Sequence, residues 1–336
     1  MLRRALLPLV ALGLLLAPGS AFAAQDWFAS VYSPQGVEVR ADERLFTLFA
    51  VMNALGYDDA PVVRQYPVAR REFSHVRAHV RQALASLDPK LKEQMSAFFD
   101  EHPLALGQYV AYTAQLGPAP QFAAPASVQP AQLQGFEKQL AAVYQAAKIH
   151  ELFAEVQEAY RADTKAYLAL VDEPLGKARK ILRDPAGRAI VAVNDLDGRG
   201  AAQAVPVGAD ALLVLGPSPK PDVQAVVRAY ARLVLDPILA KRGGVLKGAA
   251  EQAAVVRVNG GPALESASDF ASELLARAIA IKVASTDPAG DEEAQLKLGF
   301  AGIKEAVRAV DTIGKPDRPL EQVVPDVLAG IELRKK

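Results

Sequence analysis

Apolar residues recur at intervals of three and four along much of the chain, which is the spacing of amphipathic helices. The clearest case runs from Glu43 to Leu55 and is followed by the stop signal Gly56-Tyr57-Asp58-Asp59. The same spacing predicts helices over residues 68–87, 89–100, from 104 onward, 132–170, 222–235, 268–284, 295–310 and 320–333. Because 132–170 is long for one helix of a globular protein, we expect a kink or an interruption within it.

Three short apolar runs, at 189–193, 204–207 and 211–215, are separated by Asp, Gly and Arg residues and predict strands. Pro206 has no N–H to donate, so its strand is expected at a sheet edge. These patterns predict an α+β protein that is mostly helical, with one small antiparallel sheet packed beside the helix over 222–235.

The first residues have the order of a secretory signal. Arg3 and Arg4 precede an apolar block over 5–17, and Ala21-Phe22-Ala23 forms a cleavage site of small residues. The alternative, an uncleaved membrane anchor, is disfavoured because Pro8 and Pro18 interrupt a run that is shorter than the ~20 residues a spanning helix needs. We expect cleavage after Ala23 and a secreted or periplasmic protein without stable membrane insertion.

The overall composition excludes several functional classes. The chain has no cysteine, which rules out disulfides, thiolate nucleophiles, Cys-ligated metals and a lipoprotein anchor. It has 38 basic and 38 acidic side chains, of which the signal removes only Arg3 and Arg4. This near-neutral balance gives no electrostatic basis for binding nucleic acid.

A stretch rich in Pro, Ala and Gln at 117–131 has almost no charge and predicts a linker or a long surface loop. It divides the mature chain into an N-terminal helical region, 24–116, and an α+β region, 132–336.

The predicted helix over 222–235 has the frame of a zinc-peptidase helix without its chemistry. In a His-Glu-x-x-His motif two imidazoles lie one turn apart and hold zinc, and the Glu acts as general base. The three corresponding positions here are Arg228, Ala229 and Arg232. A guanidinium stays protonated and has no lone pair to donate, so neither arginine can ligate a metal.

Several short segments, in this order, resemble a family of secreted bacterial zinc-metallopeptidase-like proteins of the gluzincin type. They are Asn53-Ala54-Leu55-Gly56-Tyr57, Asn194-Asp195-Leu196, Leu213-Val214-Leu215-Gly216-Pro217, Asp236-Pro237 and Glu273-Leu274-Leu275-Ala276-Arg277-Ala278-Ile279. The resemblance implies that Arg228 and Arg232 stand at the zinc-binding His positions and Ala229 at the general base. It also implies that Asp236 replaces an Asn after the helix and that Glu273 is the remaining ligand position. A peptidase-like fold that has lost its reaction, and that holds no metal or other cofactor, is the expected result.

Two interpretations of these charged positions are open. Arg228 and Arg232 could lie on a solvated helix face, and Glu273 could pair with Arg277 at i+4 on its own helix. Alternatively, Arg228 or Arg232 pairs with Glu273 and replaces the lost divalent ion as its counter-charge.

Other candidate sites are weaker. His75 and His79 lie one turn apart and could hold a metal with Glu72, although the same residues fit a charged helix face. His150-Glu151 begins like the zinc motif, but Ala154 stands where the second His would be. Neither a phosphate-binding glycine loop nor a Gly-x-Ser-x-Gly motif is found in the sequence.

The sequence thus favours an exported, non-catalytic, peptidase-like protein. Arg228, Arg232 and Glu273 together carry a formal charge of about +1, so a peptide carboxylate or another anionic group is the expected ligand. The alternatives are an active hydrolase with a relocated metal site at His75 and His79, and a structural helical protein of the cell envelope.

Overall fold

The computed structural model describes residues 30–56, 74–183, 187–198, 201–218, 220–242, 246–315 and 317–333. Within these ranges helices predominate and one five-stranded sheet is formed, so the α+β, mostly helical prediction is confirmed. The predicted signal over 1–23 lies outside the described residues. Among the helices that are described, none is both long enough and apolar enough to cross a bilayer.

The sheet has the order β1-β2-β3-β5-β4. Its strands are β1 (Ser30–Tyr32), β2 (Val37–Arg40), β3 (Ala189–Val193), β4 (Ala202–Val207) and β5 (Asp210–Leu215). The three predicted strands are therefore present, and Pro206 lies in the edge strand β4 as expected.

The sheet is mixed, whereas a purely antiparallel one was expected. β2, β3 and β5 run parallel to one another, and only the edge pairs β1–β2 and β4–β5 are antiparallel. The difference arises because β4 folds back outside β5 as a hairpin, and because β2 comes from the first helical region. Every residue of β3 is buried, as is usual for a central parallel strand covered on both faces.

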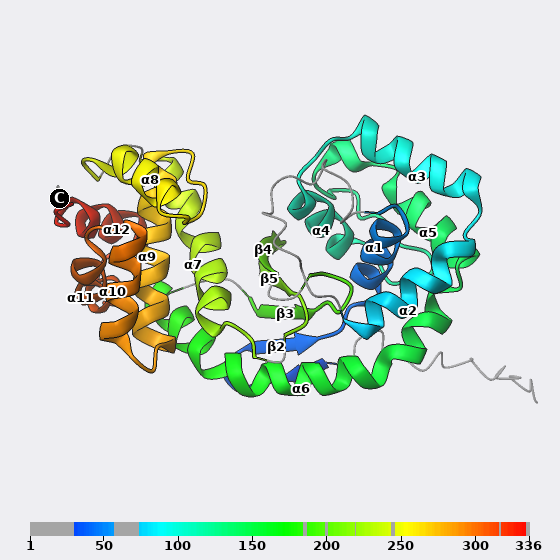
Figure 1. Ribbon diagram of the computed structural model, residues 1–336, viewed down its shortest axis with the longest axis horizontal. Coiled ribbons are helices and arrows are strands. Elements are labelled where there is room, and N and C mark those ends of the chain that lie inside the picture. The colour runs from blue at the N-terminus through cyan, green and yellow to red at the C-terminus, as the bar shows by residue number, and fades with distance from the viewer. Residues whose placement is uncertain are drawn as a thin grey trace, which may run out of the picture.

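Helices gather in two groups at the two ends of the sheet (Figure 1). One group contains α1 (Glu43–Ala54), α2 (His75–Ala83), α3 (Pro89–Glu101), α4 (Leu106–Gln115) and α5 (Phe136–Ala146). The other contains α7 (Val223–Ala240), α8 (Ala249–Val258), α9 (Ala267–Ala284), α10 (Pro288–Leu298), α11 (Ile303–Ile313) and α12 (Leu320–Ala329). The long α6 (Ile149–Leu182) runs beneath the sheet and joins the two groups.

The expected interruption of the 132–170 stretch lies between α5 and α6. Lys148 takes a left-handed conformation there, with a φ of 50°. Beyond this point α6 continues through Pro174 to Leu182, although the sequence signals placed its end near 170. Leu175 and Leu182 are fully buried, and this packing offsets the hydrogen bond lost at the proline.

Helix α7 likewise passes through Pro237 and ends at Ala240, five residues later than predicted. Ile238 and Leu239 are buried, so the last turn is held by core contacts. The predicted helix over 295–310 is in fact parts of α10 and α11, which are separated at Gly299 and Gly302, both with positive φ. The short helix α8 was not predicted.

The Pro/Ala/Gln-rich stretch at 117–131 is a packed loop. Phe122 is fully buried and its ring contacts that of Tyr144 on α5, with the centroids 5.6 Å apart. The strand β2, which precedes this loop in the chain, pairs with β3, which follows it. One sheet therefore contains strands from both sides of the loop.

Candidate functional site

The residues at the zinc-motif positions lie on α7 and α9, which pack along each other. Asp222 caps α7 by accepting a hydrogen bond from the Ala225 N–H at 3.0 Å. Ser266 caps α9 in the same way, through the Asp269 N–H at 3.0 Å. The run from Phe270 to Ile281 on α9 is buried throughout, so this helix forms a fixed wall behind α7.

Arg232 is at the centre of the charged residues between the two helices. Its guanidinium donates two hydrogen bonds of 3.2 Å to the two carboxylate oxygens of Asp236, one turn later on α7. It also reaches α9, where Nη2 lies 3.5 Å from Asp269 and Nη1 lies 3.5 Å from Oε2 of Glu273. Burial acts to lower the pKa of Arg232, but the carboxylates of Asp236, Glu273 and Asp269 outweigh it, so the pKa is raised above its usual value.

Glu273 is bound on both sides. Its Oε1 forms an ion pair with Nη2 of Arg277 on the same helix, at 2.7 Å, and its Oε2 faces Arg232. The Glu273 and Arg277 side chains are only 8% and 9% exposed, and Arg277 lies over the ring of Phe300 at 4.2 Å. Both proposed partners of Glu273, the one on its own helix and the one on α7, are thus in contact with it.

Arg228 differs from Arg232. Within the described part of the chain it forms one ion pair, a 3.6 Å contact with Asp222, whose side chain is 61% exposed. The Arg228 side chain is 23% exposed and that of Arg232 is 28% exposed, so protein covers about three quarters of each. Neither arginine lies on an open solvated face, and Arg228 is the less completely paired of the two.

The charge of the cluster differs from the expected value of about +1. That value counted only Arg228, Arg232 and Glu273. The structure adds another cation and three more carboxylates, so the cluster consists of Arg228, Arg232 and Arg277 with Asp222, Asp236, Asp269 and Glu273. Its formal charge is therefore negative. Arg228 and Arg277 are close enough for the charge of Arg228 to help burial lower the pKa of Arg277.

Comparisons of this chain with protein-family models, with curated proteins and with solved structures give no match. The resemblance to gluzincin-type peptidases therefore stays a prediction. Ala229, at the position that the resemblance gives to the general base, is half-buried, and its methyl packs against the core.

His75 and His79 are both exposed on α2. His79 Nε2 lies 2.8 Å from Oε2 of Glu155 on α6, and Glu72 lies outside the described residues. Across the described ranges, no group of three or more His, Cys, Asp or Glu side chains is arranged to hold a metal ion. His150 instead contacts the buried Glu43, whose Oε1 lies 2.9 Å from its Nδ1.

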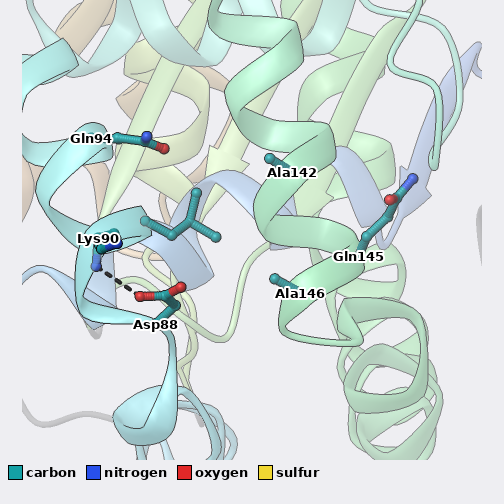
Figure 2. A pocket seen from close by; sticks show the side chains of 7 residues that line it. Asp88, Lys90, Gln94, Ala142, Gln145 and Ala146 are labelled. Atoms are coloured by element: carbon teal, nitrogen blue, oxygen red, sulfur yellow. Dashed lines mark hydrogen bonds between the residues drawn. The ribbon is translucent and has the colours of Figure 1, made fainter.

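Two cavities of the described structure are lined by residues outside the α7–α9 cluster. One, of about 650 Å³, is a shallow space between α3 and α5 (Figure 2). In it Asp88 already accepts the N-terminal hydrogen bond of α3 from Lys90 N. The other, of about 560 Å³, is lined by α8, α10 and α11. Neither contains a residue of the predicted site.

Asp195, which follows β3, interacts with Asp163 on α6, and this acidic pair was not predicted. A usable signal was present, since polar residues directly after a buried parallel strand often lie at a functional edge of the sheet.

Zinc content gives a direct test of the predicted loss of metal chemistry. We expect no stoichiometric zinc after purification without chelator, because arginines occupy two of the ligand positions. The third position, Glu273, is paired with arginines. Elemental analysis of the dialysed protein measures this. One tightly held zinc ion per chain would contradict the prediction, and its loss in His75→Ala would place the metal on α2.

Proposed function

We propose that this protein is an exported, non-catalytic, peptidase-like binding protein, in which arginines on α7 and α9 replace a lost zinc ion. The observation that carries the proposal is the contact of Arg232 on α7 with Glu273 on α9 at 3.5 Å. The resemblance assigns these two positions to ligands of one metal ion, and the fold brings them together from segments far apart in the sequence.

The same positions argue against hydrolysis at this place. Ala229 has no group that could accept or donate a proton, and a general base within reach of the attacking water is needed for this chemistry. The carboxylate of Glu273 already pairs with the fixed charges of Arg232 and Arg277, so it does not serve as a general base in place of Ala229.

Arg228 is the side chain best suited to contact a ligand. A guanidinium has five N–H donors, and among the described residues Arg228 forms one ion pair, with the exposed Asp222. Carboxylates bind guanidinium groups through paired hydrogen bonds. The proposed ligand is therefore an anionic group, and the C-terminal carboxylate of a peptide has the right chemistry.

The neighbouring strand β4 supports a peptide as the carrier of this carboxylate. β4 lies beside α7 and forms the outer edge of the sheet. The bond from Gly216 N to Ala201 O sets the pairing with β5, so Ala202 and Ala204 direct their backbone groups outward. Backbone groups on the edge strand of a sheet can pair with an extended peptide.

Binding of a carboxylate can be tested with N-acetyl-trialanine, with its amidated form as the comparison. We expect the carboxylate peptide to bind and Arg228→Gln to weaken it about 10–100-fold, since hydrogen bonds to charged groups contribute ~1.5–3 kcal/mol. Calorimetric titration measures both affinities. Arg308→Gln is the matched control, because Arg308 also pairs with one carboxylate within the described ranges, that of Glu305, but its side chain is 71% exposed. Equal binding of both peptides, or no effect of Arg228→Gln, would contradict the proposed ligand.

A further inference from the structure

The cavity between α8, α10 and α11 has the size and the lining of a small-molecule site. It lies in the helical group formed by α7 to α12 (Figure 1) and has a volume of about 560 Å³. Ligand pockets usually measure ~300–1,000 Å³ and combine apolar walls with a few polar groups. The lining of this cavity comes from the three helices, from the loop over 299–302 and from the C-terminal segment at Glu332.

Part of the apolar lining is open to solvent. Val255 on α8 is 42% exposed and is one of five large apolar residues that are exposed in the described structure. Leu296 on α10 and Ala301 on the loop line the same space and are half-buried. A ligand with an apolar body is favoured here, because its binding removes this apolar surface from water.

Two glycines allow the loop to lie close to the neighbouring elements. Gly299 and Gly302 both have positive φ, of 100° and 86°. A Cβ atom at Gly299 would lie 2.9 Å from Cγ1 of Val255, and one at Gly302 would lie 2.7 Å from Cγ2 of Ile331. Side chains at these positions would push the loop away from α8 and from the C-terminal segment. The loop contributes only small residues to the lining, namely Gly299, Ala301 and Gly302.

The cavity offers one cation and one carboxylate to a ligand. Its charged lining residues are Lys297, Lys304, Glu305 and Glu332. Lys304 pairs with a glutamate of α10, and Glu305 pairs at 3.1 Å with an arginine of its own helix. Lys297 and Glu332 form no ion pair within the described ranges. A ligand that has both an anionic and a cationic group matches these two charges.

Two amide side chains add groups that suit a peptide bond. Gln252 and Asn259 lie on the same face of α8 as Val255, three residues before it and four residues after it. Asn259 Nδ2 donates to the Lys297 carbonyl at 3.1 Å. The Oδ1 atom of Asn259 and the amide of Gln252 have no partner among the residues that the structure describes. An amide side chain supplies both donors and an acceptor, as recognition of a peptide bond requires.

We propose that this cavity binds a dipeptide that has free termini and apolar side chains. Lys297 pairs with its carboxylate, Glu332 with its ammonium group, and Gln252 with its peptide bond. The apolar side chains lie against Val255 and Leu296. A sphere of this volume is about 10 Å across and an extended dipeptide spans about 7 Å, so the ligand fits.

Calorimetric titration with leucyl-leucine tests the proposal, with its N-acetylated and its C-amidated forms as comparisons. We expect the free dipeptide to bind about tenfold more tightly than either blocked form, because each block removes one charge-assisted contact. Lys297→Gln should abolish the preference over the amide, and Glu332→Gln the preference over the acetylated form. Lys165→Gln is the control, because Lys165 is an exposed lysine on α6 outside the cavity, and it should leave all three affinities unchanged.

Arg228→Gln separates this site from carboxylate binding at α7, and it should not change the affinity for leucyl-leucine. Loss of binding in Arg228→Gln together with full binding in Lys297→Gln would place the dipeptide at α7 and overturn the cavity site. Equal affinities for the free and the blocked forms would also overturn it. So would the absence of measurable binding at dipeptide concentrations of about 10 mM.

Discussion

The triple variant Arg228→His, Ala229→Glu, Arg232→His should bind one zinc ion per chain at micromolar concentration. The two new imidazoles would lie one turn apart on α7, facing α9, and Glu273 would supply the third ligand. Removal of Arg232 frees Oε2 of Glu273, since Arg277 holds only Oε1. The fourth position of the metal would be open to water. Calorimetry with zinc and elemental analysis of the dialysed variant measure the uptake.

Two further variants test whether α7 and α9 keep the metallopeptidase geometry or only match its residue types by chance. Adding Glu273→Ala to the triple variant should abolish zinc binding, whereas adding Glu158→Ala, which removes an exposed carboxylate on α6, should not. Peptide hydrolysis is not expected, because hydrolysis also needs supporting groups beyond the ligands. A folded triple variant that takes up no zinc would show that α7 and α9 do not keep the metallopeptidase geometry.

Glu273→Gln should lower the free energy of unfolding by about 3 kcal/mol and the melting temperature by ~5–10 °C. The carboxylate is buried between Arg277 and Arg232, and its loss leaves the guanidinium of Arg277, whose side chain is 9% exposed, without its counter-charge. Burial already lowers the pKa of Arg277, the mark of a cation that depends on a partner. Chemical denaturation of the two proteins gives the difference in free energy.

Double-mutant cycles assign the effect to one partner. Glu273→Gln with Arg277→Met should show strong coupling, of about 2 kcal/mol. Coupling with Arg232→Met should be weaker, because Arg232 keeps Asp236 and Asp269 as partners. Glu158→Gln removes a 2.7 Å pair with Arg161 that is 87% exposed on the glutamate side, and should change stability by less than about 0.5 kcal/mol. Equal effects of Glu273→Gln and Glu158→Gln would rule out a buried counter-charge.

Local signals predicted helix starts well. Asp88 followed by Pro89 places the first turn of α3, and the structure shows that cap, with Asp88 accepting from Lys90 N at 2.9 Å. Signals for helix ends were less reliable. Pro174 and Pro237 each lie inside a helix, because the buried residues that follow them gain more from packing than the proline removes.

Contacts between residues far apart in the chain could not be predicted from one sequence alone. Val37 and Val39 are buried in β2 beside β3, but β2 has only four residues and its partner lies far along the chain. The contact between Arg232 and Glu273 followed from the resemblance, whereas Asp269 joined the cluster only through the packing of α9 on α7. The acidic pair depends on burial at the end of β3, which residue types alone do not reveal.

The pairing of β2 with β3 also sets the order in which this chain can fold. Val37 leaves the ribosome early, but its partner Ala189 follows only after α1 to α6 have been made. Until then the four-residue strand β2 has no neighbour on that side, and closing so long a loop is slow. The central sheet is therefore completed only after α1 to α6 have been synthesised, and during that time this edge of β2 stays unpaired.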